Sequence, residues 1–455
     1  MPVTPGAVAG SSVGGSAPRT ARRPISRDLD RRVTVGGMGV AIGFVLAAVV
    51  AAVLGTGNRG TAWLPLHLAL AGGAGTAVAS VLPFFSTALA VAAPASPWVR
   101  SGAIGLVALG AAVVSASVAS GQAFLGHIGG SAYLVGIAGV AIVAFRPLRG
   151  SLGPRRHRIE LAYAAALLHV GLSVAVATAF LAGWAPIVER WASLKPAHAW
   201  LNVVGFISLV IVGTLVHLAP TIEGNRIRPR RSAAVAIGGI ALGVPMIAAG
   251  YASETDLLAR VGGLVVLAGA IGVPVHALAV ARDRGHWTTD LDWHRVTTRS
   301  LRAASAWFAA AILVAAGRVI WLGADPAGWS IGLVAAPLAI GWVLQVLIAA
   351  WSHLLPAIGP GDPRAHAAQR RILGTLAGPR LLAMNGGVGL LWIGSATGVP
   401  VIGTIGAAAV VAALLGAVAL AASAALSGVR SSWASPREQP PVARALASPR
   451  GRRPG

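Results

Sequence analysis

Twelve apolar stretches run through this chain, and the loops between them alternate between arginine-rich and arginine-poor. The hydrocarbon layer of a bilayer is about 30 Å thick, so a spanning helix needs roughly 20 apolar residues at 1.5 Å of rise each. The pattern therefore predicts an all-α polytopic membrane protein with about twelve transmembrane helices. The expected helices cover residues 35–56, 62–92, 98–122, 126–146, 158–184, 197–221, 231–252, 257–280, 298–322, 328–356, 380–397 and 400–426.

Composition supports the same class of protein. Hydrophobic residues make up 56% of the chain and charged residues only 11%, with a mean hydropathy of +0.75. In a soluble domain about a quarter of the residues are charged, so this composition indicates a membrane protein. The length of the chain therefore limits the number of transmembrane helices and not the number of soluble domains.

The arginines predict the orientation. If the chain starts in the cytoplasm and crosses twelve times, 31 of its 36 Lys and Arg fall on the cytoplasmic side. The opposite side has only Arg59, Arg190 and Lys195, with Arg260 and Arg318 just inside helix ends. Basic loops are retained in the cytoplasm, which places the protein in the cell membrane with both termini cytoplasmic. The net charge of +23 is thus a topology signal with anionic lipid as its partner, not a sign of nucleic-acid binding.

The chain divides into three parts. Residues 1–34 and 427–455 are rich in Pro, Ser, Ala, Gly and Arg, a composition that cannot bury a core and predicts disordered basic cytoplasmic tails. Residues 35–426 form the transmembrane domain. The longest loops inside it, 281–297 and 357–379, are too short to fold as separate globular domains.

A weak internal repeat accompanies this topology. Pro83, Pro220 and Pro356 lie near the ends of the second, sixth and tenth expected helices and are separated by 137 and 136 residues. Twelve helices would then be three four-helix units in a pseudo-threefold arrangement. A Gly-Thr pair precedes the first two prolines, but its register slips by one residue, and prolines near helix ends also occur by chance.

The chain has no cysteine, which excludes disulfides, thiolate metal sites and cysteine nucleophiles. A phosphate-cradling glycine loop, a G-x-S-x-G elbow and an H-E-x-x-H motif are also absent from the sequence. We assign no catalytic residue on this basis, and whether the protein is an enzyme stays open.

Histidine is the side chain that could hold a redox metal here, because imidazole is a usual ligand of haem iron, copper and zinc. Predicted depth sorts the histidines into two candidate metal sites. The outer site has His67, His127 and His198; the inner site has His217 and His353, each opening an H-L-x-P helix exit. For each of them, and for His276 and the most deeply placed histidine, His169, the alternative is an interfacial or helix-bridging residue that is hydrogen-bonded to a neighbour. The histidines expected to be solvated in cytoplasmic loops are His157, His286, His294 and His366.

One arginine and three amide side chains within the expected helices also have a binding and a structural interpretation. Arg318, one turn inside the outer end of its helix, could clamp an anionic group such as a haem propionate, or its side chain could extend to the interface. Asn202, Gln345 and Asn385 are expected to bridge helices. Carboxylates are scarce, and none lies mid-membrane, which disfavours a proton- or sodium-coupled carrier.

Short motifs resemble the membrane proteins related to haem-copper oxidase subunit I. Residues 196–202, read as P-A-H-A-W-L-N, with Gly213-Thr214-Leu215 and Pro220-Thr221 downstream, are similar to a segment of actinobacterial relatives, some of which form the membrane part of putative copper nitrite reductases or multicopper oxidases. The runs 66–71 and 352–356 look like the second and tenth helices of that family. The resemblance implies a haem or copper cofactor held by His67 and His198 with Arg318 nearby, a role in respiratory or nitrogen-oxide electron transfer, and a redox partner subunit.

The departures from that family are substantial. The expected seventh helix has no histidine, the tenth has only His353, and Trp200 replaces the second histidine of the family's H-A-H-L-N run. His67 and His353 differ in predicted depth by about 20 residues, or roughly 30 Å, whereas two axial haem ligands lie only about 4 Å apart. A complete oxidase centre is therefore not expected. Two alternatives stay open: a cofactor-free transporter or channel for a small solute, and a membrane scaffold for partner subunits.

Overall fold

The computed structural model describes residues 28–55, 63–90, 92–150, 157–359 and 361–434. Within these ranges the chain is helical and has no strand, which confirms the all-α polytopic fold. Eleven helices of the described part are long and apolar enough to cross a membrane. The predicted tails, 1–34 and 427–455, lie outside the described residues at 1–27 and 435–455. Residues 28–34 and 427–434 were wrongly assigned to the tails, because they continue the helices α1 (Asp28–Leu54) and α16 (Pro400–Ala434).

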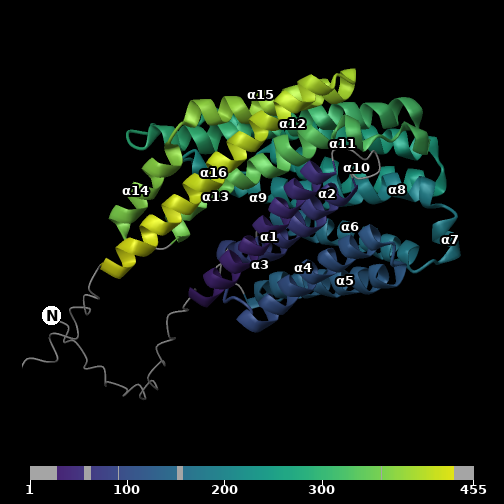
Figure 1. Cartoon of the computed structure of the whole chain (residues 1–455), viewed down its shortest axis with the longest axis horizontal. Coiled ribbons are helices and arrows are strands. Elements are labelled where there is room, and N and C mark those ends of the chain that lie inside the picture. Colours follow the sequence, from purple (N-terminus) through teal and green to yellow (C-terminus); the bar gives the residue numbers. More distant parts are fainter. Residues whose placement is uncertain (1–27, 56–62, 91, 151–156, 360, 435–455) are drawn as a thin grey trace, which may run out of the picture.

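Along the chain the described helices divide into three consecutive groups, here called units, each with one π-helical segment. Figure 1 shows how they pack into one bundle. The first contains α1 (Asp28–Leu54), α2 (Trp63–His67), η1 (Leu68–Ala74), α3 (Gly75–Leu89), α4 (Pro97–Ser120) and α5 (Ala123–Phe145), followed by the turn η2 (Arg146–Gly150). The second contains α6 (His157–Leu181), α7 (Ala185–Val188), α8 (Trp191–Ala199), η3 (Trp200–Ser208), α9 (Leu209–Ile222), α10 (Arg231–Ser253) and α11 (Asp256–Arg282). The third contains α12 (Leu291–Leu322), the turns η4 (Pro326–Gly328) and η5 (Ile331–Leu333), η6 (Ala336–Leu344), α13 (Gln345–Ile358), α14 (Pro363–Gly374), α15 (Ala377–Thr397) and α16 (Pro400–Ala434).

The twelfth predicted crossing segment is α15. It is a helix of 21 residues, but Arg380 and Asn385 make it less apolar than the other eleven. The start of α1 and the end of α16 lie at the same end of the bundle, which fits an even number of crossings (Figure 1). The number of crossings and the side on which the termini lie stay predictions.

Several helix ends differ from the predicted ones, and the first helix has a clear physical reason. α1 begins at Asp28, seven residues before the expected start. Arg100, counted among the cytoplasmic arginines at the start of the expected helix 98–122, is only 1% exposed in α4 and forms an ion pair with Asp30. Its guanidinium also donates hydrogen bonds to Thr34 Oγ1 and Ser80 O at 3.0 and 3.2 Å. This buried pairing ties α1, α3 and α4 together and extends the folded part of the chain to Asp30.

The second helix of each unit contains a π-helical segment. η1, η3 and η6 are these segments, and they occur in the three helices that carry Pro83, Pro220 and Pro356. The helix that contains η3 is the most buried candidate span, with 72% of its most apolar window inside the protein. π-Helical turns are rare and frequently mark functional or tightly constrained places, because each one inserts an extra residue and frees backbone groups.

In each unit, a ring from the first helix lies over a glycine of this π segment. A Cβ atom on the glycine would sit 2.3 to 2.7 Å from the ring, so a larger residue cannot be accommodated without displacement. The three pairs are Phe44 over Gly72, His169 over Gly205 and Trp307 over Gly341. The same contact between corresponding helices in three units supports the pseudo-threefold arrangement.

The third and fourth helices of each unit pack as a tight hairpin. Glycine allows the backbones of two membrane helices to approach closely. A Cβ on Gly110 of α4 would lie 2.6 Å from the backbone of α5, and a Cβ on Gly239 of α10 would lie 2.6 Å from Gly269 of α11. The equivalent distance from Gly394 of α15 to Gly403 of α16 is 2.5 Å. The third hairpin therefore repeats the first two, although α15 is less apolar.

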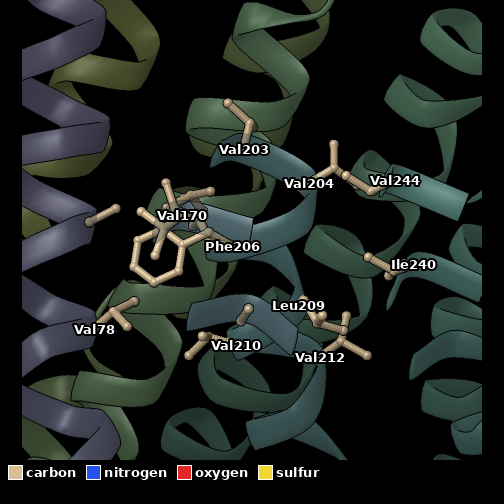
Figure 2. Packing of buried hydrophobic residues seen from close by; sticks show 14 of the residues in the cluster. Val78, Val170, Val203, Val204, Phe206, Leu209, Val210, Val212, Ile240 and Val244 are labelled. Carbon is tan, nitrogen blue, oxygen red and sulfur yellow. The ribbon is translucent and has the colours of Figure 1, made fainter. Parts of the chain in front are cut away.

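Large side chains fill the centre where the units meet. Trp200 and Trp342 are 1% and 0% exposed, and the Trp342 indole N–H donates to Ser208 Oγ at 3.0 Å, which links η6 to η3. Figure 2 shows Phe206 and Val78 on one side of the η3–α9 helix. Ordinary core packing thus occupies the middle of the bundle.

Candidate functional site

An electrostatic interaction links two of the predicted ligands, His67 and His198. His67 is the last residue of α2, and His198 lies in α8 two residues before η3, so each imidazole directly precedes a π segment. The two rings are close enough to interact electrostatically. We refer to His67 and His198 as the outer histidine pair, because they lie at the predicted outer end, where α7 and α8 are found (Figure 1).

The His67 ring is held by its own helix. It stacks on Trp63 with ring centroids 3.8 Å apart, and its Nδ1 lies 3.0 Å from Trp63 O. A carbonyl oxygen can only accept a hydrogen bond, so Nδ1–H is the donor. In a neutral imidazole this leaves Nε2 with the free lone pair that a metal ion requires.

The His198 ring is held by a network between α6 and the α8–η3 helix. Its Nδ1 lies 2.9 Å from Ser173 Oγ, and the Ser173 hydroxyl donates to His198 O at 3.1 Å. The Asn202 amide donates to Ser173 Oγ and His198 O at 2.5 and 2.9 Å. These two short hydrogen bonds use both hydrogens of the Asn202 amide, so the contact of 3.3 Å between the amide nitrogen and His198 Nε2 is weaker than either of them. We infer that the lone pair of His198 Nε2 is available.

The remaining outer residues have other contacts. His127 is half-buried in α5 and meets the edge of the Phe124 ring, one turn earlier. Arg318 donates from Nε to Gly328 O at 2.8 Å and lies near Tyr251 and Asp325. Among the described residues, no three His, Cys, Asp or Glu side chains are placed to hold a metal ion together. The outer site that the structure assembles is thus a pair of histidines and not a trio.

The two inner histidines lie in α9 and α13, and the pairing expected between them stays a prediction. His353 stacks on Trp293 of α12 with centroids 5.4 Å apart and interacts electrostatically with His294. Trp293 is fixed by its N–H, which donates to Ser352 O at 2.7 Å. His217 is half-buried in α9, where Thr221 Oγ1 donates to its carbonyl oxygen.

Sequence reasoning missed two members of these groups. His294 was expected to be a solvated loop residue, but α12 begins at Leu291, which places His294 half-buried beside Trp293. The neighbouring Trp293 was the one feature of the sequence that could have indicated a buried position for His294. Ser173 lies in the middle of an apolar helix, and nothing in the sequence distinguishes it from other helix serines.

The deepest histidine bridges helices, as its alternative interpretation proposed. His169 is 4% exposed, and its Nδ1 lies 3.0 Å from Gly205 O in η3. The π segment leaves the Gly205 carbonyl oxygen available as an acceptor, and His169 Nδ1–H donates a hydrogen bond to it. The backbone of Ala241 in α10 is a second hydrogen-bond partner of the ring, so His169 bridges three helices and is not placed among the candidate ligands.

Two neutral imidazoles are the protein ligands of a bis-histidine haem and of a two-coordinate copper ion. The haem also needs a slot for its macrocycle, whereas a copper ion needs only the two metal–nitrogen bonds.

Known proteins add no assignment. No protein-family model matches the sequence, and a comparison with curated proteins gives no match.

Proposed function

We propose that this protein is a membrane-embedded copper- or haem-binding component of electron transfer, similar in type to haem-copper oxidase subunit I but without a complete oxidase centre. The observation that carries the proposal is the outer histidine pair, in which two helices bring imidazoles together with each Nδ1 already engaged. When bound, the metal would supply one-electron redox chemistry. A partner subunit that exchanges electrons at the outer face belongs to the same proposal.

The surrounding residues would keep the ligands neutral and oriented. Trp63 fixes the rotation of His67 through its carbonyl and its ring, and Ser173 and Asn202 fix His198. Within the described part of the chain, neither histidine contacts a carboxylate, so the ligands themselves are uncharged. Uncharged ligands favour a low-charge ion such as Cu(I) over Zn²⁺ or Mg²⁺.

Metal analysis and an optical spectrum of the purified full-length protein test the proposal. The protein should be expressed in haem-replete cells with copper supplied. We expect about one copper ion or one Soret-absorbing haem per chain, lost in His67→Ala and in His198→Ala. His127→Ala is the matched control, since it removes an outer histidine whose contact is with Phe124. A colourless and metal-free wild-type protein would refute the proposal.

A solute path has less support. It would have to pass the level at which Trp200, Trp342 and Phe206 fill the centre. The pocket among α12, α13, α15 and α16, next to Gln345 and Arg380, has room for about 20 Å³, close to a single water molecule.

A further inference from the structure

A basic pocket of about 270 Å³ opens at the start of α12. It lies between the loop that follows α11 and the first three turns of α12, at the predicted cytoplasmic end of the bundle. Four arginines line it, Arg284 from the loop and Arg295, Arg299 and Arg302 from the helix, together with Trp287. The three helix positions are four and three residues apart, so they share one face of α12.

The pocket has more positive than negative charge. Arg302 donates from Nε and Nη2 to Oε1 of the buried Glu223 at 3.1 and 2.5 Å, and Arg295 pairs with Asp292 at 2.8 Å. For Arg284 and Arg299, no carboxylate of the described residues lies within ion-pairing distance. Two guanidinium groups are therefore left to meet an anion.

The wall of the pocket is held in place before any ligand binds. The Trp287 ring stacks on His294 with centroids 4.4 Å apart and the two planes almost parallel at 4°. The Arg284 guanidinium lies 5.4 Å from the Trp287 ring centroid. The buried Glu223 anchors Arg302 across α9 and α12. A rigid wall lowers the conformational entropy lost on binding.

We propose that this pocket binds a phosphate group, with the headgroup of an anionic phospholipid as its source in the membrane. A guanidinium presents paired N–H donors that match phosphate oxygens, and a surplus of two positive charges matches a doubly charged phosphomonoester. Basic pockets between helices at the cytoplasmic face are a recurrent form of lipid headgroup site. Free inorganic phosphate shares this chemistry and is distinguished from lipid by the experiment.

The test measures lipid retained by the full-length protein in nanodiscs of phosphatidylcholine doped with phosphatidic acid. We expect enrichment of phosphatidic acid around the wild-type protein and a loss of affinity of about tenfold for Arg299→Gln and for Arg284→Gln, since each variant removes one charge-assisted contact to the phosphate. Arg371→Gln is the matched control: an exposed arginine in α14 that does not line the pocket. Its affinity should equal that of wild type.

A second arm adds inorganic phosphate to protein in phosphatidylcholine alone and follows the unfolding temperature. Saturable stabilisation that requires Arg299, without enrichment of phosphatidic acid, would assign the pocket to soluble phosphate. Enrichment without such stabilisation would assign it to lipid. The proposal would be overturned if the Arg284→Gln/Arg299→Gln double variant bound phosphatidic acid as well as wild type does. It would also be overturned if Arg371→Gln lost as much affinity as the pocket variants, because anionic lipid would then be attracted by the basic surface in general. Metal content plays no part in these readouts, so they stand apart from the test of the outer histidine pair.

Discussion

At the scale of single residues, several polar groups inside the helices hold histidine rings in place. Ser173 and Asn202 hold His198, the Trp63 carbonyl holds His67, and Gly205 O holds His169. A hydrogen bond inside a membrane protein is worth only about 0.6 kcal/mol on average, so stability alone gives a weak reason for a three-residue network around one imidazole. Orientation of a ligand gives a stronger one.

Ser173→Ala tests that orientation. The substitution removes the hydroxyl that contacts His198 Nδ1 and the Asn202 amide. Loss of such a supporting contact typically lowers metal affinity by about 10- to 100-fold, and we expect a reduction of that size in a copper titration of the purified protein. Ser305→Ala is the control, since Ser305 is equally buried but bonds only to Leu301 O of its own helix. Equal affinities in all three proteins would mean that the network has a purely structural role.

The buried Arg100–Asp30 pair gives a prediction about stability. Removing one partner leaves a buried charge without compensation, which typically costs about 3–5 kcal/mol. We expect Arg100→Met to lower the free energy of unfolding by about that amount, measured by thermal or chemical unfolding in detergent. The double variant Arg100→Met/Asp30→Leu removes both charges and should recover most of the loss. If the double variant is no more stable than the single one, the ion pair is not the cause.

At the scale of helices, the π segments organise each unit. They lie in the second helix of every unit, and each places a glycine beneath a ring from the first helix. The outer histidine pair immediately precedes two of these segments, so the local backbone that sets the ring-on-glycine contact also sets the rotation of both ligands. The third segment, η6, has no histidine before it, which fits a site built from two helices.

Gly205→Ala probes the π segment directly. The new Cβ would lie 2.7 Å from His169 Nδ1, so the ring must move and its bond to Gly205 O weakens. Overpacking of this kind costs about 1–3 kcal/mol, and we expect a lower unfolding temperature together with weaker metal binding. Gly238→Ala in α10 is the control, because nothing lies within 4 Å of its added Cβ. A neutral Gly205→Ala would contradict the close packing of His169.

At the scale of the whole molecule, the three units and the common end of the two described termini lead to a topology prediction. The chain has no cysteine, so single cysteines can be labelled without background. In intact cells, Glu189→Cys and Thr397→Cys should react with a membrane-impermeant maleimide, and Thr288→Cys and Arg371→Cys should react only after the membrane is opened. Protection of Thr397→Cys in intact cells would mean that α15 does not cross.

The sequence alone determined the helical membrane fold, because a hydrocarbon layer demands runs of about 20 apolar residues wherever the chain crosses it. It also indicated the threefold repeat through Pro83, Pro220 and Pro356. It did not reveal the π segments, since an extra residue per turn leaves no mark on an apolar run. The start of α1 was misplaced because residues 28–34 are mostly polar or charged, and only tertiary packing brings Asp30 to Arg100.

Tertiary structure decided which histidines meet. Depth along the helices placed His67 and His198 at the same level. Rotation about each helix axis decides which side chains face one another, and rotation depends on packing against other helices. His127 contacts Phe124 of its own helix. His353 stacks on Trp293 and interacts electrostatically with His294. The sequence determined the level of each polar residue in the membrane, and the packing of the three units decided the partner it meets there.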